Sequence, residues 1–292
     1  MSDPAVERDA AEAASAFAHP PVEPDATAPY GDHPDQTVDF YAPRTGTGPA
    51  PLVVLVHGGA WRAPYDRRHV TPLADFLARQ GYAVANVEYR RGSPVPHQGA
   101  TGPIAGRWPE TFDDLAAALD ALPGLAASAV PRADPRRTVL TGHSAGGHLA
   151  LWAAARHLLP ADATPAWRLA APPRLRGVVA LAPIADFTVA EELGVCGGAC
   201  AQLLGGPDGF AARRPYADPA ALLPSGIATT LVHGREDIVV PARVSESYVD
   251  AAATAGETVG LTLLDGVGHF ALIDPAADAC AVVAEEIAQL AW

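Results

Sequence analysis

Residues 138 to 150 read TVLTGHSAGGHLA, and this stretch decides the fold. It joins a short apolar run to a Gly-x-Ser-x-Gly turn, Gly142 to Gly146, and then to an Ala-rich segment. This order predicts a buried strand, a sharp turn and a helix, which is the context of a nucleophile elbow. Such a turn strains the backbone of Ser144 and projects its hydroxyl from the edge of the sheet. Gly142 and Gly146 fit such a turn, because we expect a side chain at either position to clash with the neighbouring strand or helix.

The hydroxyl of Ser144 becomes a good nucleophile only when a base takes its proton. In an open α/β sheet the working residues gather at the carboxyl ends of the strands. His269 follows the last predicted strand on a glycine-flanked loop, and we predict that it is the base. Asp237 follows the preceding strand and is predicted to orient the imidazole and stabilise its protonated form. Glu236 and Asp265 are rivals for this role, although Asp265 fits a turn better.

A Gly-Gly turn follows the first buried strand, in the sequence HGGAW from His57 to Trp61. Attack on a carbonyl builds negative charge on its oxygen, so backbone N–H donors are needed beside the serine. We predict that Gly58, Gly59 and Ala145, the residue after the serine, supply these oxyanion donors. The alternative is a plain Gly-Gly turn. His57 is expected to hold this loop by a hydrogen bond and not to take part in the chemistry.

Strand patterns and helical patterns alternate from residue 52 to the end of the sequence. That alternation is typical of a parallel sheet with helices on both faces. We therefore predict an α/β fold with a mostly parallel, doubly wound sheet. A small irregular cap or loop region is expected at residues 187–225, with short helical pieces such as residues 199–204. The predicted strands are residues 36–41, 52–56, 82–87, 138–140, 177–182, 228–232 and 260–264. The predicted helices are residues 67–80, 109–122, 144–159, 241–255 and 275–290, the last capped by Asp274.

The N-terminal segment, residues 1–29, is rich in Ala, Pro, Asp and Glu. Prolines end the short helical pattern of residues 10–17, so we expect an N-terminal arm that is partly disordered. Residues 30–292 are expected to form a single domain, and the sequence carries no internal repeat.

The composition argues against several classes of partner. The chain has a net charge of −13, which makes nucleic acids and anionic membranes unfavourable partners. No apolar run reaches the roughly 18 residues that a membrane helix needs, and the first residues lack the pattern of a signal peptide. We therefore expect a cytoplasmic protein that acts on a small molecule. A homodimer is left open.

Lysine, metal and disulfide chemistry are not predicted. All 20 basic residues are Arg, which excludes a Schiff base or a Ser-Lys dyad. Three cysteines form no disulfide framework. Cys196 and Cys200 fit either small apolar residues or a redox or metal pair, and the absence of a second Cys or His cluster favours the first reading. The zinc-protease and P-loop patterns are absent, so no metal and no cofactor is expected.

Several further side chains are candidates for the surroundings of the serine. Glu88, past a strand end, either pins the Gly-Gly loop through hydrogen bonds or pairs with Arg90 or Arg91. His148, one helical turn after the serine, is interpreted as a buried helix histidine. A long loop at residues 92–107 is expected to border the pocket. Aromatic residues predicted to line an acyl or leaving-group pocket, with ordinary packing as the alternative, are Trp61, Trp108, Phe187 and Phe270.

These motifs together resemble a known family over residues 36–292. The chain order Ser144, Asp237, His269 is that of the α/β-hydrolases. The HGGAW and GHSAGGHLA motifs, with YGDHPDQ from Tyr30 and EYR from Glu88, resemble the kynurenine formamidase-like and related carboxylesterase group. The resemblance implies an α/β-hydrolase fold and hydrolysis of small formamides or esters through a serine triad, without a cofactor.

The predicted function is therefore a serine hydrolase of the arylformamidase type, which cleaves a small ester or formamide through an acyl-enzyme. The alternative is a broad-specificity carboxylesterase acting on short-chain aryl or feruloyl-type esters. A peptidase of the prolyl-oligopeptidase type normally needs a propeller domain, for which the chain has no room. A non-catalytic ligand receptor on the same fold would be expected to lack a member of the triad, and all three are present.

Overall fold

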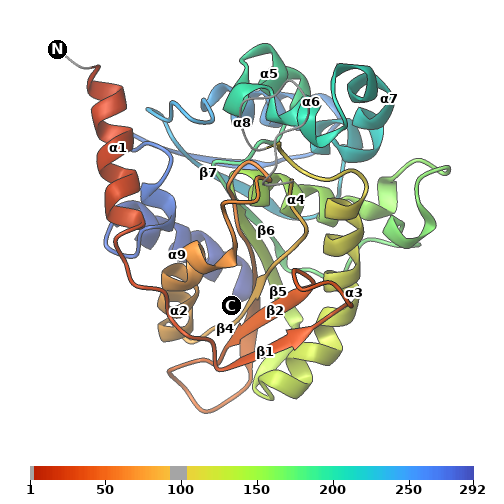
Figure 1. The fold of residues 1–292 in the computed structure, drawn as a ribbon. Coiled ribbons are helices and arrows are strands. Elements are labelled where there is room, and N and C mark those ends of the chain that lie inside the picture. The colour runs from red at the N-terminus through yellow and green to blue at the C-terminus, as the bar shows by residue number, and fades with distance from the viewer. Residues whose placement is uncertain (1–2, 93–103) are drawn as a thin grey trace.

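The structure is a computed structural model that describes residues 3–92 and 104–292. Its strands form one sheet in the order β1-β2-β4-β3-β5-β6-β7-β8 (Figure 1). The strands are β1 (Ala26–Pro29), β2 (Thr37–Tyr41), β3 (Ala50–Val56), β4 (Ala83–Val87), β5 (Ala133–His143), β6 (Gly177–Leu181), β7 (Thr229–Gly234) and β8 (Gly260–Leu264). Strands β3 to β8 pair with one another in parallel, whereas β2 pairs antiparallel with both β1 and β4. The predicted mostly parallel sheet is confirmed.

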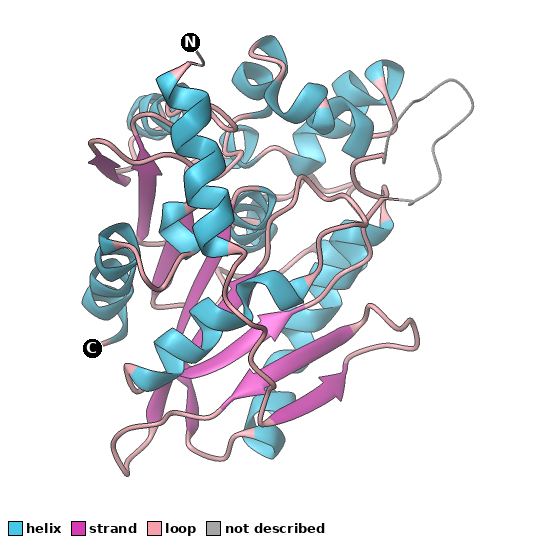
Figure 2. Cartoon of the chain, turned by 60° about the vertical axis from the view of Figure 1, so that its left-hand side comes forward, coloured by secondary structure: helices cyan, strands magenta, loops and turns pink. Residues whose placement is uncertain are grey.

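Helices cover both faces of this sheet (Figure 2). The α-helices are α1 (Pro4–Ala16), α2 (Thr71–Arg79), α3 (Glu110–Ala129), α4 (Ala145–Ala154), α5 (Phe187–Glu192), α6 (Ala199–Leu203), α7 (Pro207–Ala217), α8 (Arg243–Thr254) and α9 (Asp278–Ala291). Short 3-10 turns lie at Arg67–Val70, Arg156–Leu158, Pro165–Trp167, Val195–Gly197, Pro219–Leu222 and Ala271–Ile273. The region expected to be an irregular cap, residues 187–225, contains α5, α6 and α7.

Two hydrophobic cores lie on opposite faces of the sheet. Successive side chains of a strand point to opposite faces. Accordingly Leu52 and Val54 of β3 belong to the core under α3, α4 and α8. Val53 and Leu55 belong to the core under α2 and α9. All four side chains are fully buried, which explains why this strand is a continuous apolar run and not an alternating one.

The turn between β5 and α4 packs directly against β3. A Cβ atom on Gly142 would lie 2.3 Å from the carbonyl oxygen of Gly146. A Cβ atom on Gly146 would lie 2.1 Å from the carbonyl oxygen of Val56. The expectation that side chains here would clash is confirmed, and these glycines allow α4 to begin close to the end of β3.

The N-terminal segment corrects the sequence prediction. Residues expected to form a partly disordered arm instead form α1 and then β1, which pairs with β2. Asp3 caps α1 by accepting from the Ala5 N–H, and Ala16 is buried against the core on the α2 and α9 face. The helical pattern of the sequence was too short to predict this, because the stability of the helix comes from its tertiary contacts.

Three helix boundaries also differ clearly from the predictions, one being that α4 ends at Ala154 and is followed by the 3-10 turn Arg156–Leu158. Helix α3 continues through Pro123 to Ala129. Helix α9 begins at Asp278, and Asp274 does not cap it but lies at the end of the 3-10 turn Ala271–Ile273. The predicted loop at residues 92–107 lies largely outside the described residues.

Within the described residues, no helix is both long enough and apolar enough to cross a membrane. The same residues hold no group of three or more His, Cys, Asp or Glu side chains arranged for a metal ion. The cytoplasmic location and the homodimer remain predictions.

The contact between the elbow and β3 makes a testable prediction. Gly146→Ala should lower the free energy of unfolding by about 1–3 kcal/mol, because the added methyl group meets the Val56 carbonyl oxygen. Gly124→Ala in α3 is the matched control, since a Cβ atom there meets nothing within 4 Å. It should leave stability unchanged or raise it by up to about 1 kcal/mol. Urea unfolding of both variants measures the difference, and equal stabilities would contradict the proposed clash.

Candidate active site

Ser144 lies at the carboxyl end of β5, in the turn that leads into α4. Its φ is 57° and its ψ is −119°, a positive-φ conformation that non-glycine residues rarely adopt. The turn is held by hydrogen bonds from the Ser144 N–H to the Leu181 carbonyl (2.8 Å) and from the His148 N–H to the Ser144 carbonyl (3.1 Å). Ser144 is buried, and it lines a small cavity. The strained turn expected from the sequence is therefore present.

His269 and Asp237 form a buried pair on neighbouring loops, after β8 and β7 respectively. His269 Nδ1 lies 2.6 Å from Asp237 Oδ2. A carboxylate only accepts hydrogen bonds, so Nδ1 carries the proton and donates it. In the neutral ring this leaves Nε2 as an acceptor, the form that a general base requires. Of the rival acids, Asp265 instead pairs with Arg235 and is exposed.

The surroundings of Asp237 keep it ionised. Its Oδ1 accepts hydrogen bonds from the N–H groups of Val239 and Val240, both at 2.8 Å. His233 Nε2 lies 3.3 Å from Oδ2, a contact that the sequence reasoning missed. Burial alone raises the pKa of the Asp237 carboxyl, but the charge of His269 and the hydrogen bonds from His233 and His269 hold that pKa below its usual value. The pair therefore matches the orienting role predicted for Asp237, which itself stays a prediction.

Ser144 and His269 line the same cavity, which has a volume of about 180 Å³. Of the aromatic residues predicted to line it, Phe270 does. The remaining lining residues, which the sequence reasoning did not assign to the pocket, include one from the N-terminal segment. They are Phe17, Ala60, Arg62, Tyr65, His69, His143, Cys196, Val239 and Ile273, beside the predicted Gly59.

Three of the predicted pocket aromatics lie elsewhere. Trp61 and Phe187 are fully buried, and each packs against the ring of His148. Trp108 stacks edge-on against Trp167 and lines a different cavity. Trp61 and Phe187 follow the alternative of ordinary packing, because large aromatic side chains near strand ends can equally fill the core, and sequence position does not show which way they point.

Burial and hydrogen bonding support the structural interpretation of His148. Its Nε2 lies 2.8 Å from the Ala217 carbonyl oxygen, to which it donates. Burial lowers the pKa of His148 to about 3. The ring therefore joins α4 to the end of α7 and points into the core. Cys196 and Cys200 are both free thiols.

The Gly-Gly loop after β3 touches the elbow. A Cβ atom on Gly58 would lie 2.8 Å from the His143 carbonyl oxygen and 3.2 Å from Ser144 Cβ. Gly59 has a φ of 99° and faces the cavity, and a Cβ there would overlap Tyr65. Ala145 is the first residue of α4, where a backbone N–H has no partner within the helix. The three residues predicted as oxyanion donors are thus gathered at the serine.

A buried ion network fixes this loop from behind. His57 Nε2 lies 2.8 Å from Glu88 Oε1, and His57 Nδ1 lies 2.8 Å from the Gly58 carbonyl oxygen. Glu88 also accepts from the Arg67 N–H and pairs with the Arg91 guanidinium. Both predicted options for Glu88, pinning the loop and pairing with Arg91, are therefore realised together.

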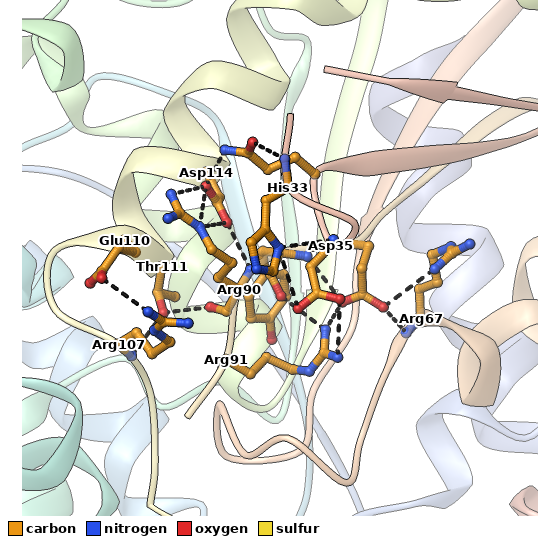
Figure 3. Close-up of polar contacts among 12 residues, drawn as sticks. His33, Asp35, Arg67, Arg90, Arg91, Arg107, Glu110, Thr111 and Asp114 are labelled. Carbon is orange, nitrogen blue, oxygen red and sulfur yellow. Dashed lines mark hydrogen bonds and ion pairs between the residues drawn. The ribbon is translucent and has the colours of Figure 1, made fainter. Parts of the chain in front are cut away.

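The charges around Glu88 stabilise its ionised form. Burial alone raises the pKa of Glu88, but His57, Arg91 and the Arg67 N–H outweigh it and lower the pKa to about 2. Figure 3 shows the outer part of this network, in which Arg90 pairs with Asp114 and not with Glu88. The network lies behind the Gly-Gly loop, and the ionised Glu88 is compensated there by charged and backbone donors.

The sequence also resembles known proteins. The sequence model of the BD-FAE family matches residues 38–251. A probable isoprenylcysteine α-carbonyl methylesterase of Oryza sativa subsp. japonica is 29% identical over 255 residues, which cover 82% of this chain and 55% of the relative. The isoprenylcysteine α-carbonyl methylesterase of Arabidopsis thaliana is 28% identical, with coverages of 82% and 55%. The chain thus spans about half the length of these curated relatives.

Solved structures share the fold. Esterase B of Lactobacillus rhamnosis HN001 superposes with a TM-score of 0.74 at 21% identity, covering 98% of this chain and 91% of that one. A truncated carbohydrate esterase from gut microbiota gives a TM-score of 0.72 at 18% identity, with coverages of 94% and 99%. The predicted α/β-hydrolase fold is confirmed.

The Glu88 network makes stability depend on pH. Glu88→Gln should lower the free energy of unfolding at pH 7 by about 3 kcal/mol, because it breaks a buried ion network. The pKa of Glu88 is about 2 when folded and near 4.5 when unfolded, so its contribution is present above pH 4.5 and is lost as the pH falls toward 2. Urea unfolding at pH 7, 5 and 3 should show the difference from wild type shrinking at pH 3. The exposed Glu285→Gln is the control, and a pH-independent difference would contradict the assignment.

Proposed function

Because the chain belongs to the BD-FAE family of α/β-hydrolases, we propose that it is a serine ester hydrolase, and specifically a carboxylesterase for esters of short-chain acids. The observation that carries the proposal is the cavity that Ser144 shares with His269, whose ring is hydrogen-bonded to Asp237. This arrangement contains a nucleophile, a base and the group that orients the base.

Acylation follows from the positions of these groups. Ser144 Oγ attacks the ester carbonyl carbon while His269 Nε2 takes the hydroxyl proton. The N–H groups of Gly58, Gly59 and Ala145 stabilise the negative charge on the carbonyl oxygen. His269 then gives its proton to the alcohol oxygen as the carbon–oxygen bond breaks, which leaves an acyl-enzyme on Ser144.

Deacylation repeats the same steps with water. His269 takes a proton from a water molecule, whose oxygen attacks the acyl carbon. Collapse of the tetrahedral intermediate returns the proton to Ser144 Oγ and releases the carboxylic acid. Asp237 stabilises the protonated imidazole at both stages and stays ionised.

The size of the cavity favours small acyl groups. Its volume of about 180 Å³ is below the roughly 300–1,000 Å³ of pockets for drug-sized ligands. Burial and the neighbouring His57 lower the pKa of His69 to about 4, so this part of the lining is uncharged at pH 7. Phe17, Tyr65 and Phe270 add apolar surface.

A formamide substrate, as an arylformamidase would use, is the second candidate, because a formyl group also fits a cavity of this size. Ester substrates are favoured because the relatives named above carry the names of methylesterases. One assay should therefore compare esters of different acyl length with a formamide.

The nucleophile is tested by Ser144→Ala. This variant should lose ester hydrolysis by a factor of about 10⁴ or more, because the acyl-enzyme cannot form. It should also fail to react with a fluorophosphonate probe, while circular dichroism shows that it remains folded. Hydrolysis or labelling at the wild-type rate would overturn the mechanism, and a wild-type protein that is not labelled would favour a ligand receptor.

Substrate range is tested with p-nitrophenyl acetate, butyrate and octanoate, methyl ferulate and N-formylkynurenine. We expect kcat/KM to be highest for acetate or butyrate and to fall for octanoate and ferulate, since longer or bulkier acyl groups exceed the cavity. A higher kcat/KM for N-formylkynurenine would instead assign the protein to the formamidases.

A further inference from the structure

Helix α1 lies against the loop that carries His269. Figure 1 shows it beside the C-terminal part of the chain, although the two are at opposite ends of the sequence. The Glu12 carboxylate accepts three backbone hydrogen bonds there. Oε1 accepts from the Gly268 N–H at 2.7 Å, and Oε2 accepts from the Phe270 and Ala271 N–H groups at 3.2 and 3.4 Å.

These bonds bracket the predicted base. The Gly268 N–H precedes His269 and the Phe270 N–H follows it, so one carboxylate fixes the backbone on both sides. A Cβ atom on Gly268 would lie 2.8 Å from Glu12 Oε2, so glycine at this position allows the close approach. The Phe270 and Ala271 amide groups lie at the start of the 3-10 turn Ala271–Ile273, where donors lack partners within the turn and a negative charge is favourable.

The far end of the same loop is held by α1 as well. The Ser15 hydroxyl donates to Asp274 Oδ2 at 2.5 Å, and His19 Nε2 lies 2.7 Å from Asp274 Oδ1. The segment from Gly268 to Asp274 is thus attached to the N-terminal segment at both ends.

The body of the protein holds His269 from the other side. His143 Nε2 donates to the His269 carbonyl oxygen at 3.0 Å, and Asp237 holds the imidazole. Burial and the neighbouring His269 keep the pKa of His143 well below its usual value, so its ring is neutral and its donor role is fixed. His143 and Asp237 thus contact the carbonyl group and the imidazole of His269. The backbone N–H groups of the residues before and after His269 are bonded by Glu12.

The N-terminal segment also reaches the cavity. Phe17 directly follows α1 and lines the cavity with Ser144. Its ring centroid lies 5.3 Å from that of Phe270 and 5.9 Å from that of His69. The ring is 42% exposed, so it forms the outer wall of the cavity and not part of the core.

We propose that the N-terminal segment completes the active site: Glu12 is a positioning residue for His269, and Phe17 is a wall that limits the length of the acyl group. This inference rests on the proposed ester hydrolysis. A base must be held close to its reacting geometry, and a displacement of about 1 Å costs about 100-fold in rate. Glu12 supplies that constraint although it lies 256 residues before Gly268 in the sequence.

The positioning role is tested by Glu12→Ala and Glu12→Gln. Glu12→Ala should lower kcat for p-nitrophenyl acetate by about 10- to 100-fold and change KM by less than about threefold, because ground-state binding does not need the base. Glu12→Gln should retain part of kcat, since its amide oxygen still accepts from one N–H. The control is Glu285→Gln, an exposed carboxylate on α9, which should match the wild type.

The rate of fluorophosphonate labelling separates this proposal from the proposed function. The probe reports attack by the serine without requiring any ester to be a substrate. If the wild type is labelled but hydrolyses no ester, the substrate proposal fails, and a labelling rate lowered in Glu12→Ala still supports the positioning role. If Glu12→Ala is only less stable to urea and keeps the wild-type kcat and labelling rate, the positioning role is overturned.

The wall is tested by Phe17→Ala. Removal of the ring should raise kcat/KM for p-nitrophenyl octanoate relative to acetate by about tenfold, because it gives room to about two further methylenes, each worth about fourfold. The matched control is Val6→Ala, an exposed apolar residue on α1. An unchanged octanoate-to-acetate ratio in Phe17→Ala would overturn the assignment of Phe17.

Discussion

The close contact between the elbow and β3 is the constraint on which the rest of the site depends. Gly146 rests on the carbonyl oxygen of Val56, and Gly58 rests on the elbow at the serine. No side chain fits at either contact. The approach brings the end of β5 and the loop after β3 together, so the first N–H of α4 and the Gly-Gly loop lie beside one hydroxyl. Because backbone atoms make these contacts, the geometry is rigid before any substrate arrives.

The buried carboxylates Glu88 and Asp237 at this edge of the sheet each have several compensating partners. Glu88 stands among His57, Arg91 and backbone donors, and Asp237 stands among two histidines and two backbone N–H groups. Removing a charge from water is costly unless partners replace the lost hydration. One network supports the Gly-Gly loop and the other supports the base, so the two halves of the site are held independently.

The N-terminal segment adds a third support from outside the sheet. Glu12 lies on α1 and Phe17 is the C-cap residue of that helix, which is stabilised by what it touches. Substitutions in a surface helix of this kind can change the cavity and the His269 loop without altering the sheet. Variation in such a segment would offer a route to different specificities on one scaffold.

The sequence by itself determined the pattern of strands β2 to β8, the elbow and the order of Ser144, Asp237 and His269, because these depend on local periodicity, glycine geometry and position after a strand. It also indicated the loop-holding role of His57. It did not determine the cavity wall, where Trp61 and Phe187 proved to be core and Phe17 proved to be lining. Only the tertiary structure decided this, since the direction of a side chain and the contacts of Glu12 join residues far apart in the chain, and local sequence carries no record of such long-range packing.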